Sequence, residues 1–147
     1  MSHYQHILVA IDYSAHSEAV MSKAKALAES YQAKLSLVHI LDNIPMPDTP
    51  YGTVISLDED SSYALLEAEK VKLLAFAEQF TLEQANCWLI WGIPKQEIVQ
   101  LARQEQVDLI VLGSHGRHGL ALLLGSTANS VLHYSDCDVL AVRLQDK

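Results

Sequence analysis

The chain has 147 residues, half of them apolar, and a net charge of −8 at pH 7, which is the size and composition of one domain with a substantial core. The acidic balance and the scatter of the ten basic residues argue against a nucleic-acid partner. No apolar run approaches the roughly 18 residues of a membrane span. Without a secretory signal pattern, we expect a single cytoplasmic domain over residues 1–147.

The first third of the chain predicts a β-α-β unit. His6–Ile11 is a continuous apolar run, which is typical of a strand buried on both faces. Ser14 is a good N-cap for the helical spacing that extends to Tyr31. Lys34–Leu41 is a second apolar strand, and such units close with a right-handed connection.

The middle of the chain begins with its one long irregular stretch, residues 42–60, which contains three prolines and is expected to be functional or mobile. Residues 62–80 return to helical spacing, although Lys70 interrupts the apolar stripe. Residues 86–91 predict a third strand, and Pro94 suits the first turn of a helix that ends near Gln104.

The last third predicts a fourth strand at residues 108–112, a helix over Ser126–Tyr134 and a fifth strand at residues 138–143. Strands and helices therefore alternate along the whole chain. This alternation predicts an α/β fold with an open parallel sheet and helices on both faces.

The segment after the fourth strand is rich in glycine. In an open α/β sheet, ligands bind beyond the carboxyl ends of the strands, where the strand order reverses, so Asp12 and Gly113 should face one crevice. Glycines such as Gly113, Gly116 and Gly125 let backbone N–H groups approach a ligand and form an anion-binding concavity. The helix that opens at Ser126 also attracts negative charge at its N-terminus.

Side chains of the same segment could add to such a site. The hydroxyls of Ser126 and Thr127 can donate to phosphate oxygens, Arg117 offers a positive charge, and His115 offers a ring donor. The alternatives are that the glycines only form a tight turn, that Ser126 only caps its helix, and that His115 faces solvent.

Six segments, in this order, resemble the universal stress protein family: ILVAIDYS (7–14), LVHI (37–40), GIP (92–94), DLIVLGSHG (108–116), LLGS (123–126) and CDVLAV (137–142). The resemblance implies a five-stranded parallel sheet of order 3-2-1-4-5. One branch of this family binds ATP through a loop of the form Gly, two residues, Gly, nine residues, Gly-Ser or Gly-Thr.

Gly113, Gly116, Gly125 and Ser126 match that loop, but eight residues rather than nine separate Gly116 from Gly125. One missing residue shortens an extended loop by up to about 3.3–3.6 Å. The glycines are nevertheless retained, which favours nucleotide binding, while a narrowed phosphate site stays open as the alternative.

By this resemblance, the residues expected to contact the nucleotide are Ala10, Ile11, Asp12, Ile40, Leu112, Gly113, His115, Gly116, Arg117, Gly125, Ser126 and Thr127. A bound ATP would bring Mg²⁺ held by its own phosphates. The loop lacks the lysine of a Walker motif, and no residue is assigned a catalytic or protein-built metal role. An ATP-binding regulatory module of the stress response is therefore the first hypothesis. A slow ATPase or phosphotransferase and a ligand-free dimeric scaffold are the alternatives.

The predicted fifth strand is made apolar by Val139, Leu140, Ala141, Val142 and Leu144. As an edge strand it invites pairing with another chain. Members of the family dimerise through this strand, so the resemblance implies a homodimer, with a further protein partner also open.

Overall fold

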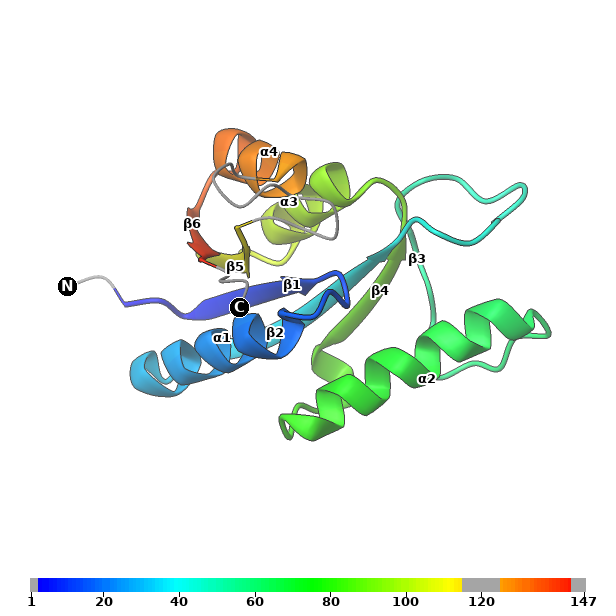
Figure 1. The fold of residues 1–147 in the computed structure, drawn as a ribbon, viewed down its shortest axis with the longest axis horizontal. Helices are drawn as coiled ribbons and strands as arrows, with labels where there is room; N and C mark the ends of the chain where they lie inside the picture. The colour runs from blue at the N-terminus through cyan, green and yellow to red at the C-terminus, as the bar shows by residue number, and fades with distance from the viewer. Residues whose placement is uncertain (1–2, 115–124, 144–147) are drawn as a thin grey trace.

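The structure is a computed structural model, and it describes residues 3–114 and 125–143. Its strands are β1 (His6–Ile11), β2 (Lys34–Leu41), β3 (Thr53–Val54), β4 (Cys87–Trp91), β5 (Leu109–Gly113) and β6 (Asp138–Val142). Its helices are α1 (Ser17–Tyr31), α2 (Ala64–Gln79), α3 (Pro94–Gln104) and α4 (Ser126–Tyr134), with one 3₁₀ turn at Gln84–Asn86. Figure 1 shows these elements around one twisted sheet.

The sheet has the order β3-β4-β2-β1-β5-β6. Five of its strands are parallel in the order β4-β2-β1-β5-β6, which confirms the predicted arrangement 3-2-1-4-5. The predicted number of strands was wrong by one, because β3 pairs antiparallel with β4. A strand of two residues inside a proline-rich segment is too short to show a hydrophobic period, so it could not be predicted from the sequence.

Both faces of the sheet are covered by helices. Alternate residues of β1 belong to different cores: Ile7 and Val9 to the one beneath α1 and α2, and Leu8 to the one beneath α3 and α4. Figure 1 shows the same two layers, one on each side of the sheet. Burial on both faces explains why β1 is apolar without alternation.

The predicted N-cap of the first helix was wrong. Helix α1 begins at Ser17, and its N-cap is His16. The Ser14 carbonyl accepts a hydrogen bond from the Ser17 N–H at 3.1 Å, and the Ser14 N–H donates to Asp12 Oδ1 at 2.9 Å. Serine and aspartate are common both at helix caps and in tight turns, because their side chains hydrogen-bond to nearby backbone groups. Here they form a turn at the end of β1.

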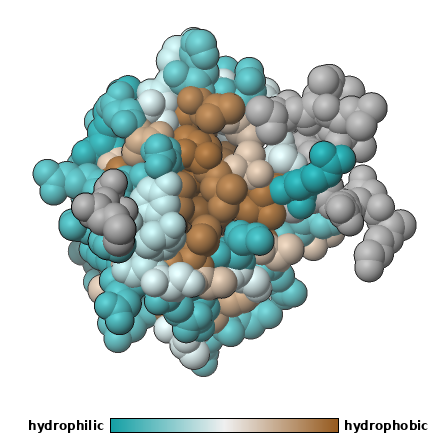
Figure 2. All heavy atoms as spheres, turned by 90° about the vertical axis from the view of Figure 1, so that its left-hand side faces the viewer, coloured by the Kyte–Doolittle hydropathy of each residue, from teal (hydrophilic) through white to brown (hydrophobic). Residues whose placement is uncertain are grey.

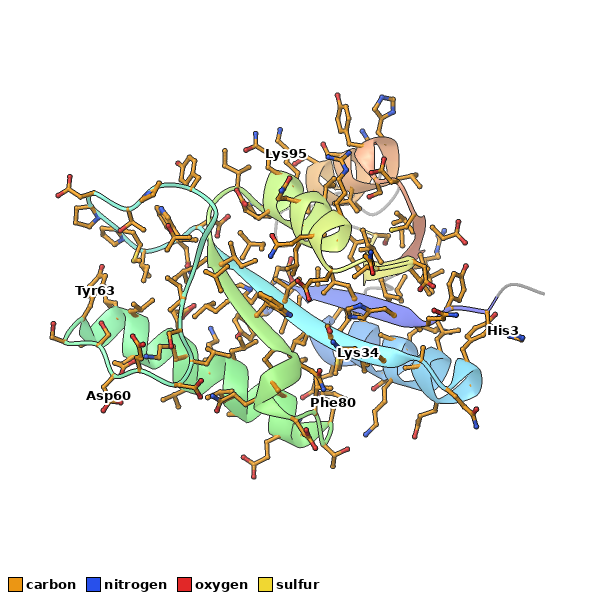
Figure 3. All side chains as sticks on the ribbon, turned by 180° about the vertical axis from the view of Figure 1, so that it is seen from behind. His3, Lys34, Asp60, Tyr63, Phe80 and Lys95 are labelled. Carbon is orange, nitrogen blue, oxygen red and sulfur yellow. The ribbon has the colours of Figure 1, made fainter. Side chains whose placement is uncertain are left out.

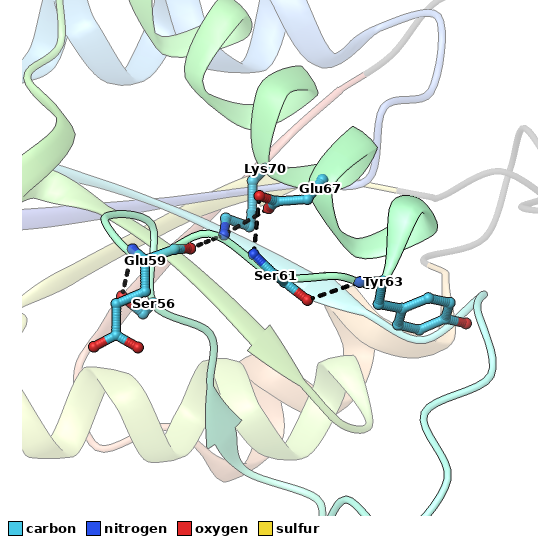
Figure 4. A network of polar contacts seen from close by, with 6 residues as sticks. All are labelled: Ser56, Glu59, Ser61, Tyr63, Glu67 and Lys70. Carbon is cyan, nitrogen blue, oxygen red and sulfur yellow. Dashed lines mark hydrogen bonds and ion pairs between the residues drawn. The ribbon is translucent and has the colours of Figure 1, made fainter.

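Lys70 lies within the apolar stripe of α2, where its amine bonds the preceding segment to the helix. Its side chain is buried, its Nζ donates to the Glu59 carbonyl, and the same atom lies 2.6 Å from Glu67 Oε2. The Ser61 N–H donates to the other oxygen of Glu67 at 3.1 Å. Figure 4 shows this network, which joins the end of the irregular segment to α2.

The side chains around α2 show how far this helix extends along the sheet. In Figure 3, Asp60 and Tyr63 lie beside its N-terminal end and Phe80 lies at the opposite end. The Tyr63 hydroxyl donates to the Pro45 carbonyl at 2.6 Å. Residues 45 and 63 are therefore held together on the side of the molecule where β2 ends.

Candidate functional site

A cavity of about 340 Å³ lies beyond the carboxyl ends of β1, β2 and β5. Strand β1 stands between β2 and β5, so the sheet order reverses there, as expected for a ligand site in an open α/β sheet. The volume is within the roughly 300–1,000 Å³ typical of small-molecule pockets.

The structure brings most of the predicted contact residues together around this cavity. Its lining includes Ala10, Ile11, Asp12, Ile40, Leu112, Gly113, Gly125, Ser126 and Thr127. The other three predicted residues, His115, Gly116 and Arg117, lie outside the described residues. Segments more than 100 residues apart in the chain thus meet at one place because β1 and β5 are neighbours.

Further residues line the cavity that were not predicted as contacts: Ser14, Ser17, Val20, His39, Asp42, Pro94, Ile98 and Ala128. Asp42 directly follows β2, so the rule that placed Asp12 at the end of β1 could also have found it. Val20, Ile98 and Ala128 have the helical spacing of ordinary core residues. No feature of the sequence distinguishes them from the rest of the core.

The N-terminus of α4 forms one side of the cavity. Gly125 is its N-cap, with its N–H bonded to the Ser114 carbonyl at 2.8 Å, so Ser126 is the first helical residue rather than the cap. No side chain of the described residues caps this end. The first N–H groups of an α-helix have no intrahelical acceptor and carry the positive end of its dipole. This side of the cavity is therefore suited to an anion.

The turn after β1 supplies a carboxylate. Asp12 accepts the Ser14 N–H through Oδ1 at 2.9 Å and lines the cavity. An ionised carboxylate only accepts hydrogen bonds, so it matches hydroxyl or amino groups of a ligand. Asp42 adds a second carboxylate to the lining.

His39 lines the cavity from within β2 and is only 4% exposed. Its Nδ1 lies 2.9 Å from the Ile11 carbonyl, which can only accept, so Nδ1 carries a proton. Its Nε2 lies 3.9 Å from Glu69 Oε1. Burial lowers the pKa of His39, although the Ile11 carbonyl and Glu69 act in the opposite direction. His39 is therefore a packed strand residue that forms one hydrogen bond.

Within 3–114 and 125–143, no group of three histidine, cysteine, aspartate or glutamate side chains could hold a metal ion. None of the helices in these same ranges is long and apolar enough to cross a membrane.

The amino-acid sequence of the chain is similar to those of known proteins of one family. The sequence model of the universal stress protein family matches residues 3–143. The chain belongs to the universal stress protein family. Universal stress protein A homolog 2 of Coxiella burnetii is 38% identical to it over 146 residues, which cover 99% of each chain. The family resemblance predicted from the six sequence segments is therefore confirmed.

Solved structures of universal stress proteins have the same fold. Protein MJ0577 of Methanocaldococcus jannaschii superimposes with a TM-score of 0.75 and 25% identity, covering 99% of this chain and 100% of that chain. A universal stress protein solved in complex with cAMP superimposes with a TM-score of 0.68 and 24% identity, covering 98% and 100%. The likeness to the cAMP complex is one of fold.

Proposed function

We propose that this universal stress protein is an adenine-nucleotide-binding regulatory module of the stress response, with ATP as its ligand. The observation that supports the proposal is the cavity beside β1 and β5, where the strand order reverses. It combines apolar walls with a helix N-terminus that no described side chain caps. A nucleotide has the same two-part chemistry, an aromatic base and anionic phosphates.

The apolar part of the cavity fits a flat base. Ile40 at the end of β2, Leu112 in β5 and Ile98 in α3 are almost fully buried, and all three line the cavity. Because these side chains are already packed in the core, they form a pre-formed apolar wall against which an aromatic ring can pack. Asp12 directly follows β1 and lines the same cavity, where a ribose hydroxyl could donate to it.

The polar part of the cavity fits phosphates at α4. The N–H groups of the first turn and the hydroxyls of Ser126 and Thr127 offer donors to phosphate oxygens. Asp12 and Asp42 also line the cavity, and none of its described lining residues is a lysine or an arginine. A divalent cation on the phosphates would reduce the repulsion from these two carboxylates, which supports binding of the Mg²⁺ complex.

The same set of residues supports binding without fast turnover. Phosphoryl transfer needs positive groups placed against the transferred phosphate, and the described lining of the cavity offers helix N–H groups only, while the predicted contact Arg117 lies outside the described residues. The structure solved with cAMP shows that one protein of this fold holds an adenine nucleotide.

We also propose that the protein forms a homodimer through β6. This strand ends the described sheet, and its residues are partly exposed and mostly apolar. Leu132, which is half exposed, lines a shallow groove together with Val139 and Leu140. Figure 2 shows a band of apolar atoms across the face of the molecule that carries β6. Pairing of two such edges would cover this band.

The proposed ligand is tested by mass spectrometry of small molecules released from the purified protein, followed by calorimetry with ATP, ADP, AMP and GTP in Mg²⁺. We expect saturable heat with an adenine nucleotide, weaker binding of GTP, and no steady release of inorganic phosphate. No heat with any adenylate at millimolar concentration would contradict nucleotide binding and leave the scaffold alternative.

A further inference from the structure

Tyr13 has an unusual backbone conformation at the edge of the cavity. Its φ is 59°, in the left-handed region that bulky residues rarely adopt. Its neighbours on both sides, Asp12 and Ser14, line the cavity, and the Asp12 Oδ1 to Ser14 N–H hydrogen bond spans the turn that Tyr13 occupies. A strained residue in such a place calls for a compensating interaction and suggests a function.

The compensating contacts come from the Tyr13 ring. Its centroid lies 4.4 Å from that of His39 and 6.2 Å from that of Phe76, and Lys72 Nζ lies 4.3 Å from it over the ring face. Phe76 and Lys72 belong to α2, which contributes none of the described residues that line the cavity. The ring thus connects the turn after β1 to a helix outside the site.

The Tyr13 hydroxyl does not provide the connection. It is buried and has no hydrogen-bond partner among the residues that the structure describes. Ring packing and the cation–π contact with Lys72 therefore hold Tyr13 in place.

We propose that Tyr13 is a positioning residue: its ring, held between His39 and α2, keeps the left-handed turn that presents Asp12 and Ser14 to the bound nucleotide. This inference rests on the proposed nucleotide-binding function. Without the ring, the backbone at residue 13 would relax toward negative φ, and the bond from Asp12 to Ser14 would open. The ligand would then have to select a minor conformation, which weakens its apparent affinity by the fraction that remains competent.

Three substitutions separate the ring from the backbone. Tyr13→Phe keeps the ring, Tyr13→Gly removes it but makes positive φ easy, and Tyr13→Ala removes it and keeps a Cβ that disfavours positive φ. We expect an ATP Kd within twofold of wild type for Phe, and about tenfold weaker binding for Ala if one chain in ten keeps the turn. Gly should fall between them. A merely structural role predicts no advantage of Gly over Ala in binding measured well below each variant's unfolding midpoint.

The coupling to Asp12 gives a second, independent readout. In an Asp12→Ala background, Tyr13→Ala should weaken ATP binding less than it does in the wild-type background, because one of the two groups that Tyr13 positions is already gone. Gln32→Gly is the matched control: Gln32 also has a left-handed φ, of 53°, at the C-terminal end of α1, and this variant should leave the affinity unchanged. Wild-type affinity in Tyr13→Ala, or an equal loss in both backgrounds, would overturn the inference.

Hydrogen exchange at the Ser14 amide separates failure of this inference from failure of the proposed function. This N–H donates to Asp12 Oδ1 and should exchange faster in Tyr13→Ala than in Gln32→Gly or wild type. If wild type binds no adenylate, nucleotide binding fails, and faster exchange still supports the positioning role. Unchanged exchange in Tyr13→Ala would overturn the positioning role whatever the protein binds.

Discussion

At the scale of single residues, His39 connects the cavity to the packing behind it. Its ring lies against Tyr13, its Nδ1 binds the Ile11 carbonyl, and Glu69 of α2 stands 3.9 Å from its other nitrogen. The charged groups that act on His39 are Glu69, Asp42 and Lys72, yet burial is the largest influence and lowers its pKa. The folded protein therefore holds His39 neutral at a pH where the unfolded chain would already bind a proton.

This difference predicts a loss of stability in mild acid. As the pH falls below about 6.5, the unfolded chain takes up a proton at residue 39 before the folded protein does, so the free energy of unfolding decreases. His39→Asn keeps a donor for the Ile11 carbonyl and cannot titrate. Urea unfolding at pH 7.5 and pH 5.5 should show a smaller decrease for His39→Asn than for wild type.

Part of the acid effect should survive in that variant. Burial also lowers the pKa of His6, whose ring contacts Ser36 and the Glu105 carbonyl away from the cavity. An identical decrease in wild type and His39→Asn would show that His39 is not held neutral by the fold.

At the scale of elements, local signals in the sequence were reliable where one physical cause determined the boundary. Helix α3 begins at Pro94 and α4 begins at Ser126, both as predicted, because proline suits the first helical turn and Gly125 precedes a clear helical period. The start of α1 was wrong because Ser14 serves a turn, and β3 was missed because two residues show no period.

The same contrast applies to the candidate site. Asp12 and Gly113 could be placed from the sequence because each stands at the end of a buried strand at the switch point. Ser17 and Ala128 could not, since their contribution depends on how far each helix is shifted along the sheet. That shift is determined by tertiary packing.

The Lys70 network, which joins the segment before α2 to the helix, allows a test at the scale of elements. Lys70→Met removes the amine that binds the Glu59 carbonyl and Glu67, leaving both acceptors without this donor. We expect a loss of about 1–3 kcal/mol in the free energy of unfolding. Lys23→Met, at an exposed position of α1, is the control and should stay within about 0.5 kcal/mol of wild type. Equal stability of the two variants in urea unfolding would show that the network does not hold the segment.

At the scale of the whole molecule, the two ends of the described sheet differ. Strand β3 is a short antiparallel strand, whereas β6 presents an apolar edge (Figure 2). A sheet edge of this kind is stable in solution when it is covered. The proposed homodimer covers it and leaves the cavity, at the carboxyl ends of the strands, to the nucleotide.

A charge at that edge should separate the proposed dimer. Ala141→Lys places an ammonium group on β6, where pairing of two copies would bring the like charges together. Light scattering coupled to size exclusion should give a dimer for wild type and a monomer for Ala141→Lys. Val71→Lys, at a position of α2 that is 68% exposed, should remain dimeric. A monomeric wild type at micromolar concentration would contradict the proposed interface.

The most direct test of nucleotide binding at the N-terminus of α4 is calorimetry with ATP on Ser126→Glu and Ser126→Gln. Ser126 is exposed at the first position of the helix, so glutamate there should favour the folded helix through its dipole while repelling phosphates. Glutamine has the same shape without the charge. The proposed function predicts that Ser126→Glu remains folded and loses ATP binding while Ser126→Gln still binds. Equal ATP affinity in the two variants would contradict a phosphate site at this helix.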